Sequence, residues 1–294
     1  MDGVYGSLAT VLRLSNDRLA WSDNRGTKIT DVNADLLYKR LWFEEPVTAR
    51  LDHLTQVAAA CAALPADLLD AVNSRRALAA RQLAAKAGHT AVAVRLTPLW
   101  RMVVGHGEDT VHETSLTMSP TYGVPIIPGS ALKGVAASQA RAEQREPWST
   151  DLTRIFGTPR PRRGQSDDGA GDPAPPAAAV EADPHAEAAQ GSVTVLDALP
   201  ITPPAVVVDV LTPHVQPYYK LDANGVPSQP PAEYHNPVPV RFLAVQDTPF
   251  LAWLVGPAAD VTRFAELLVA GADDLGIGGK TAAGYGYCTV AVEP

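Results

Sequence analysis

The chain has 294 residues, of which 46% are hydrophobic and 19% charged, and its formal net charge is −8. No run of eighteen apolar residues is present, which argues against a transmembrane helix. The two cysteines, Cys61 and Cys288, lie far apart, which argues against a disulfide framework and a cysteine-based zinc site. The acidic balance argues against a bulk nucleic-acid binder. Because the first residues lack a secretory pattern, we expect a cytoplasmic protein with no membrane partner.

A helical N-terminal region is predicted for residues 1–88. Apolar residues recur at helical spacing in three stretches, which are 33–45, 46–64 and 66–88. The first stretch is expected to place four apolar side chains on one face: Leu36, Leu37, Leu41 and Trp42. The third stretch ends in Lys86 and Gly88, whose charge and conformational freedom favour a helix C-terminus.

Residues 89–294 are predicted to form an α+β domain with a ferredoxin-like (RRM-like) fold. The expected elements are a strand at 90–105, a helix beginning near Ser130, a strand at 191–201, two strands within 237–256, a helix at 260–271 and a strand at 285–292. Simplified, this is the β-α-β-β-α-β order of the ferredoxin-like motif. Ser130 and Asp260 are expected as N-caps, Gly271 is expected to end the second helix, and the turn at Asp247–Pro249 is interpreted as an additional hairpin.

The segment 164–191 differs in composition from the rest of the chain. It is rich in Ala, Pro and Gly, and it holds six carboxylates but no Lys or Arg. Such a sequence cannot bury enough apolar surface to offset the entropic cost of ordering, so a flexible acidic insertion is predicted. Without these six charges the net charge changes from −8 to −2, which leaves room for a local basic groove elsewhere.

A glycine-rich stretch, "LGIGGKTAAGYGY" at 275–287, precedes the last predicted strand. It is not a Walker A loop, because Asp274 stands where the first glycine belongs and a helix precedes the loop instead of following it; a nucleotide-hydrolysing function is therefore not favoured. Thr281 likewise breaks the dinucleotide pattern. What remains is a loop whose glycines allow close approach to a ligand, whose N–H groups suit an anion, and where Lys280 adds a charge.

Several motifs resemble those of the RAMP proteins of CRISPR effector complexes. They are "IPGSALKGVAASQAR" at 127–141, "IFG" at 155–157, "DVLTPHVQPYYK" at 209–220, "NPVPVRFLAV" at 236–245 and "GIGGKTAAGYGY" at 276–287. The first and last are shared by many RAMP proteins, whereas the third and fourth together are similar to the sixth-subunit family of the type III-B (Cmr) complex. The resemblance covers roughly residues 90–292.

This resemblance implies a non-catalytic subunit that binds guide CRISPR RNA. Such a subunit caps the helical backbone of the complex near the 3′ end of the guide and contacts the neighbouring backbone subunit and subunit one. Target cleavage belongs to the repeated backbone subunit. Target RNA is a candidate further partner, and neither a cofactor nor a metal is implied.

The residues expected to contact RNA lie on two glycine-bearing segments. The first is a helix N-terminus with a hydroxyl and a nearby cation, and the second is the glycine-rich stretch. The full set is Gly129, Ser130, Lys133, Arg141, Gly276, Gly278, Gly279, Lys280, Thr281, Gly284 and Gly286. The alternatives left open are an ordinary capped helix with an exposed Lys133, a solvated helix face at Arg141, and a glycine stretch that is only a tight turn.

A rival function is an endoribonuclease of the same fold, which would process precursor guide RNA through a histidine base placed against the glycine stretch. The candidate bases are His106, His112 and His214. Carboxylates in 108–113 could hold Mg²⁺, lie solvated or press against target RNA. Tyr285 and Tyr287 could stack on bases or lie buried beneath the N-terminal helices.

Overall fold

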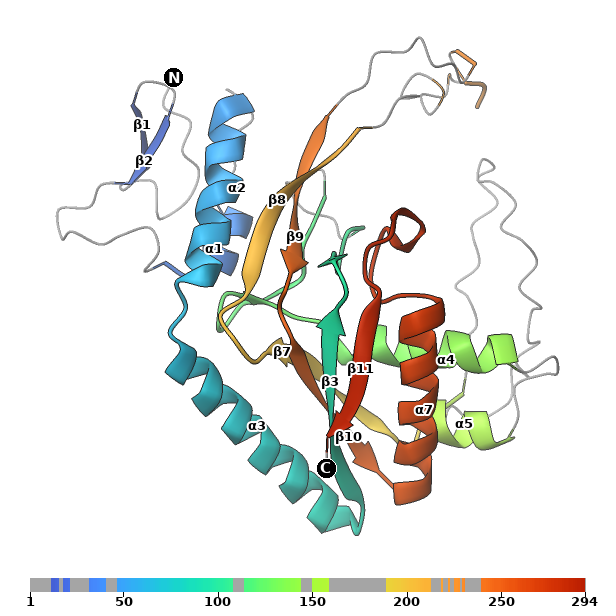
Figure 1. The fold of residues 1–294 in the computed structure, drawn as a ribbon. Helices are drawn as coiled ribbons and strands as arrows, with labels where there is room; N and C mark the ends of the chain where they lie inside the picture. Colours follow the sequence, from blue (N-terminus) through green and yellow to red (C-terminus); the bar gives the residue numbers. More distant parts are fainter. Residues whose placement is uncertain are drawn as a thin grey trace.

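The computed structural model describes most of the chain, and Figure 1 shows how its elements are arranged. The described residues are 12–15, 18–21, 32–40, 47–107, 114–143, 150–158, 189–212 and 239–293, with a few positions between 218 and 230. Helices and antiparallel sheets are combined within this part of the chain, which confirms the predicted α+β class.

Four long antiparallel strands form the main sheet in the order β11-β3-β10-β7. Their bounds are β3 (Thr90–Pro98), β7 (Thr194–Pro200), β10 (Phe250–Gly256) and β11 (Cys288–Glu293). Helix α4 (Gly129–Glu143) connects β3 to β7, and α7 (Ala258–Asp274) connects β10 to β11. Shorter elements interrupt the first connection: β5 (Met118–Ser119), β6 (Val124–Pro125) and α5 (Thr150–Phe156). The strands and helices of this unit come in the chain order β3-α4-β7-β10-α7-β11, with two further strands between β7 and β10.

Between β7 and β10, the chain runs out and back along one bent pair of strands. β8 (Ala205–Leu211) follows β7 and pairs with β9 (Val240–Gln246), which leads into β10. β4 (Arg101–Met102) pairs with the other edge of β9, giving a second sheet in the order β4-β9-β8. Figure 1 shows β8 and β9 extending beyond the main sheet.

The additional hairpin predicted at Asp247–Pro249 is wrong, because β9 and β10 do not pair with each other. Asp247 has a φ of 45°, and the Thr248 hydroxyl donates to the Gln246 carbonyl at 2.7 Å while accepting from the Ala205 N–H at 2.9 Å. These bonds tie the turn to the neighbouring strand, so it bends the chain without reversing it. The real partner of β9 is β8, which the sequence analysis did not predict.

The three predicted N-terminal helices are confirmed. They are α1 (Ala34–Arg40), α2 (Val47–Ala62) and α3 (Ala66–Ala87), and they follow an unpredicted antiparallel pair, β1 (Leu12–Ser15) and β2 (Arg18–Trp21). Helix α1 buries Ala34, Leu37 and Tyr38, and this spacing turns Leu36 to solvent, where it is 45% exposed. The shared face predicted for Leu36 and Leu37 is therefore wrong. Leu41 and Trp42 lie outside the described residues.

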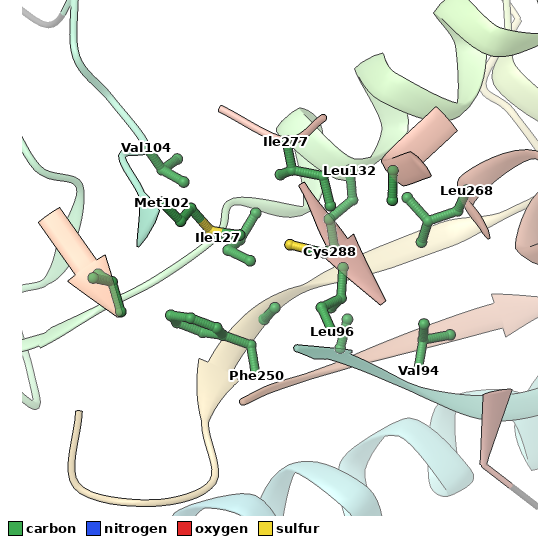
Figure 2. Close-up of a cluster of buried hydrophobic side chains, with 14 of the residues drawn as sticks. Val94, Leu96, Met102, Val104, Ile127, Leu132, Phe250, Leu268, Ile277 and Cys288 are labelled. Atoms are coloured by element: carbon green, nitrogen blue, oxygen red, sulfur yellow. The ribbon is translucent and has the colours of Figure 1, made fainter. Parts of the chain in front are cut away.

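Apolar side chains pack against both faces of the main sheet, because alternate strand residues point to opposite sides. On one face, α3 contributes Ala80 and Ala84, which pack with Trp253 of β10. On the other, α4 and α7 cover the larger core. Figure 2 shows part of that core, including Val94, Leu96, Ile127, Leu132, Phe250, Leu268, Ile277 and Cys288. Within the described residues no single helix is long and apolar enough to cross a membrane; α2 and α3 pass that test only as a pair, bent by 66°.

Helix α7 confirms its predicted apolar stripe but not its predicted ends. The stripe residues Val261, Phe264, Leu267 and Leu268 are all buried. The helix begins at Ala258 after Pro257, so Asp260 is not the N-cap. Instead, the buried Asp260 carboxylate accepts hydrogen bonds from the Arg154 guanidinium and, at 2.6 Å, from the Ser192 hydroxyl. Gly271 lies inside the helix, where a Cβ would sit 2.9 Å from Val135 Cγ1 of α4, so its smallness allows the two helices to pack.

Only the last residues of the predicted acidic insertion are described. Gln190 pairs with Gly157, and the Thr158 N–H donates to the Ala189 carbonyl at 3.0 Å, so these residues are anchored to the end of α5. Residues 164–188 lie outside the described residues. The flexibility of the insertion, and the division of the chain at residue 88, stay predictions.

Candidate nucleic-acid interface

The glycine loop, defined as residues 275–287, packs along the segment that follows β3. The Gly279 N–H donates to the Val103 carbonyl at 2.7 Å, and the Gly286 N–H donates to the Arg101 carbonyl at 2.8 Å. Ile277 of the loop is fully buried in the core and lies in the same cluster as Leu132 of α4 (Figure 2). The loop is therefore held by backbone hydrogen bonds to the segment after β3 and by a side chain buried in the core.

Close backbone packing, and not ligand contact, accounts for two of the loop's glycines. A Cβ at Gly278 would lie 2.3 Å from the Val103 carbonyl oxygen, and one at Gly286 would lie 2.1 Å from the Ile277 carbonyl oxygen. Gly279 packs against His106, and its N–H is already bonded within the chain. These residues build the loop, and the N–H groups of Gly279 and Gly286 do not face a ligand.

The remaining glycine-loop candidates differ in exposure. Gly276 packs against Thr281, since a Cβ at 276 would lie 2.8 Å from Thr281 Cγ2. Thr281 begins a short 3-10 helix, η2 (Thr281–Ala283), which ends at the exposed Gly284. A Cβ at Gly284 would have no heavy atom within 4 Å. The tip from 282 to 284 thus faces solvent, as do Leu275 and Gly278.

Lys280 lies at the centre of the loop beside an aromatic ring. Its Nζ is 5.3 Å from the centroid of Phe242 on β9, and burial lowers the pKa of its ammonium below the usual 10.5. The His106 imidazole packs edge-on to the same ring at 6.1 Å. Its pKa lies below 6.5, first because of burial and then because of the Lys280 charge. Among the three predicted histidines, His106 is the one placed here; His112 and His214, like Glu108–Glu113, lie outside the described residues.

Tyr285 is buried in an aromatic and ionic cluster, so it offers no free face to a base. It is 7% exposed, and its hydroxyl donates to Asp209 Oδ2 at 2.6 Å. Arg101 Nη1 donates to the same oxygen at 2.6 Å. Burial and the Asp209 carboxylate raise the pKa of Tyr285 to about 12. Burial alone would raise the pKa of Asp209, but the hydrogen bonds from Tyr285 and Arg101 outweigh it and the pKa is lowered.

The tyrosines do not occupy the last strand, as the sequence analysis expected, because β11 begins at Cys288. Tyr285 packs against Phe242 of the second sheet at 5.9 Å and not beneath the N-terminal helices. Tyr287 is half-buried, and its carbonyl accepts a hydrogen bond from the Leu99 N–H at 2.8 Å.

The other predicted segment begins α4, and its helix N-terminus already holds an anion from within the chain. The helix starts at Gly129, one residue earlier than predicted, so Ser130 is not the N-cap. The Gly129 N–H donates to Asp197 Oδ1 of β7 at 2.8 Å, and a Cβ at 129 would lie 2.2 Å from the Val195 carbonyl oxygen. Ser130 is exposed, Lys133 is half-buried with a pKa lowered by burial, and Arg141 is exposed in the last turn.

Sequence reasoning missed Trp100, Arg101 and Asp209. The first two lie within 90–105, which was predicted as one continuous strand. In the structure this strand is broken at Leu99 and Trp100 into β3 and β4. Asp209 fell within an unpredicted strand. A tryptophan beside an arginine within an otherwise apolar strand was the available signal. Among the described residues, no group of three or more His, Cys, Asp or Glu side chains could hold a metal ion.

We expect the His106 imidazole to be neutral at pH 7, with a titration midpoint below 6.5. Lys280→Gln should move the midpoint upward, because it removes a cation that disfavours protonation. The unfolded imidazole takes up its proton at a higher pH than the folded one. Folding stability therefore falls as the pH drops from about 6.5 through the folded pKa. NMR titration of the ring protons measures the midpoint, and an unchanged value in Lys280→Gln would contradict the contact between the two charges.

Comparison with known proteins gives a consistent set of similarities. A match to the RAMP superfamily spans residues 94–289. The chain is 32% identical to the CRISPR system Cmr subunit Cmr6 of Pyrococcus furiosus, over 63% of this chain and 64% of that protein, so the match spans just under two thirds of the relative's length. The crystal structure of Cmr6 from Pyrococcus furiosus is similar at 27% identity and a TM-score of 0.36, covering 68% of this chain and 98% of that one. A chain of the type III-B Cmr-beta complex bound to cognate target RNA is similar at 18% identity and a TM-score of 0.48, covering 77% and 66%.

Proposed function

Because the chain belongs to the RAMP superfamily, we propose that it is a non-catalytic, RNA-binding subunit of a type III-B CRISPR effector complex. Its place in the complex is the one that its sequence motifs imply: it caps the backbone near the 3′ end of the guide RNA, beside the backbone subunit and subunit one. The proposed membership in such a complex rests on the 32% identity to a Cmr6 protein.

The RNA-binding part of the proposal is carried by Lys280 on the fixed glycine loop. Its ammonium lies over Phe242, no ion-pair partner is found for it among the described residues, and the neighbouring tip from 282 to 284 is exposed. A cation held this way binds a phosphate without reading sequence. Lys133 supplies a second cation on α4, the helix whose Leu132 belongs to the same core cluster as Ile277 of the loop.

We expect Lys280→Gln and Lys133→Gln to weaken RNA binding to a similar degree for two unrelated guide sequences. Each should lower the slope of log K against log salt by about one unit or slightly less, because one phosphate contact is lost. Lys86→Gln, which removes a charge from the exposed end of α3, is the matched control and should leave the slope unchanged. Fluorescence anisotropy over a salt series measures it.

Co-purification from the native host tests the wider proposal. The chain should bring with it other RAMP subunits and a short RNA that carries a repeat-derived 5′ tag. Recovery of the chain without RNA would contradict the proposed function. If both lysine variants bind RNA with wild-type affinity, the RNA contact lies outside the two predicted segments. That outcome would not contradict the proposed assembly with other subunits.

One observation favours the rival endoribonuclease: His106 does lie against the glycine loop, since a Cβ at Gly279 would be 3.0 Å from His106 Cβ. A histidine base is usually oriented by a hydrogen bond to its second nitrogen. Here the buried Nδ1 of His106 has no hydrogen-bond partner among the described residues, and the contacts found around the imidazole are the Phe242 ring and the Lys280 charge. Metal-independent cutting of precursor guide RNA that is lost in His106→Ala would establish the rival function.

A further inference from the structure

The turn between β3 and β4 carries two large apolar side chains on the surface. Trp100 is 49% exposed and Leu99 is 66% exposed. The turn is tied to the glycine loop, because the Leu99 N–H donates to the Tyr287 carbonyl at 2.8 Å and the Gly286 N–H donates to the Arg101 carbonyl at 2.8 Å. Trp100 is therefore part of the same surface as the loop proposed to contact RNA.

The indole of Trp100 is held in place by groups that are themselves fixed. Its centroid lies 4.9 Å from that of Tyr285, and the Arg101 guanidinium lies 5.2 Å from its ring. Tyr285 and Arg101 both donate to Asp209, so neither neighbour is free to move away. The exposed part of the ring is a rigid aromatic surface, which loses little conformational entropy when a ligand stacks on it.

A row of rings connects this surface to Lys280. Lys280 lies over Phe242, Phe242 packs against Tyr285 at 5.9 Å, and Tyr285 packs against Trp100. Along the row stand two cations, Lys280 and Arg101, and one carboxylate, Asp209, so the local charge is positive in a chain of net charge −8. An exposed aromatic beside net positive charge suits a nucleic-acid strand, which carries a phosphate and a flat base in each unit.

We propose that Trp100 is a stacking surface for one base of the single-stranded RNA whose backbone contacts Lys280. This inference rests on the proposed function and names the side chain that holds a base. Stacking on an aromatic ring tolerates every base, so Trp100 would add affinity without selecting sequence. An apolar side chain of a neighbouring protein subunit is the competing occupant, and the experiment distinguishes the two.

The test compares Trp100→Leu, Trp100→Phe and Lys280→Gln in the full-length chain. The probes are two fluorescently labelled single-stranded RNAs, one of uridine only and one of mixed sequence. Trp100→Leu should weaken binding of both about tenfold with an unchanged salt slope, because no phosphate contact is lost. Trp100→Phe should keep most of the affinity, and Lys280→Gln should lower the slope. Thermal unfolding checks that each variant is folded.

Photocrosslinking provides a second readout in the assembled complex. RNA that carries a photoreactive uridine should crosslink to the peptide containing Trp100. If Trp100→Leu binds both RNAs like the wild type while Lys280→Gln is weakened, the stacking proposal is overturned and the proposed function stands. If the wild-type chain binds neither RNA, both fall. If Trp100→Leu loses assembly with other subunits but keeps its RNA affinity, the surface is a protein contact and the proposal is overturned.

Discussion

Replacing Gly286 by Ala is expected to lower the free energy of unfolding by more than about 4 kcal/mol. Gly286 has a φ of 79°, and a Cβ there would lie 2.1 Å from the Ile277 carbonyl oxygen. That oxygen belongs to backbone that cannot shift without disturbing the 2.8 Å hydrogen bond from the Ile277 N–H to the Gly286 carbonyl. Denaturant unfolding followed by circular dichroism measures the loss.

Gly284→Ala separates the cost of the clash from the cost of the backbone conformation. Gly284 also has a positive φ, of 88°, but a Cβ there meets no heavy atom within 4 Å. The expected loss is about 1–2 kcal/mol, from the left-handed conformation alone. Equal losses in the two variants would contradict the close packing of the loop against itself.

Asp209→Ala is expected to lower the free energy of unfolding by about 2–3 kcal/mol at pH 7, because it leaves the Arg101 guanidinium and the Tyr285 hydroxyl without their shared acceptor. The pKa of Asp209 is lowered from 3.8, so its contribution is present above about pH 4 and is lost as the pH falls through the folded value. The difference between variant and wild type should therefore shrink in acid.

Asp70→Ala is the matched control, since it removes an exposed carboxylate from α3 and should change stability by less than about 0.5 kcal/mol. Ultraviolet titration gives a second check. The pKa of Tyr285, raised to about 12 by burial and by Asp209, should fall in Asp209→Ala. An unchanged tyrosine titration would show that Asp209 does not accept a hydrogen bond from the Tyr285 hydroxyl.

Local periodicity was enough to predict the long helices and most of the long strands, but it missed β8 and did not show where the helices begin. The stripe of α7 follows from its own sequence, because one face of a helix repeats every three or four residues. The caps at Ser130 and Asp260 failed because each helix starts earlier, directly after Pro128 or Pro257. Both carboxylates involved, Asp197 and Asp260, bond to groups distant in the sequence, and capping rules do not consider such partners.

The glycine loop was recognised from the sequence, but the residues that it contacts were not. The glycines of 275–287 marked the loop, yet what they pack against, Val103 and Arg101, lies far earlier in the chain and could not be inferred from spacing. Trp100 lay within a stretch that was predicted as one continuous strand. In the structure β3 ends at Pro98, β4 begins at Arg101 and pairs with β9, and Trp100 lies in the break between them, where it is exposed.

The bent pair formed by β7–β8 and β9–β10 joins the two sheets by continuous backbone. Its two arms pass from one sheet into the other, with cross-links at the bend from Ile201 to Pro249 and from Ala205 to Thr248. The outer part of β8 and β9 is thereby connected to β10, which lies inside the main sheet, and through the Arg101–Gln246 hydrogen bond to the turn that bears Trp100. The outer end of this pair and the turn that holds the indole are therefore parts of one hydrogen-bonded framework.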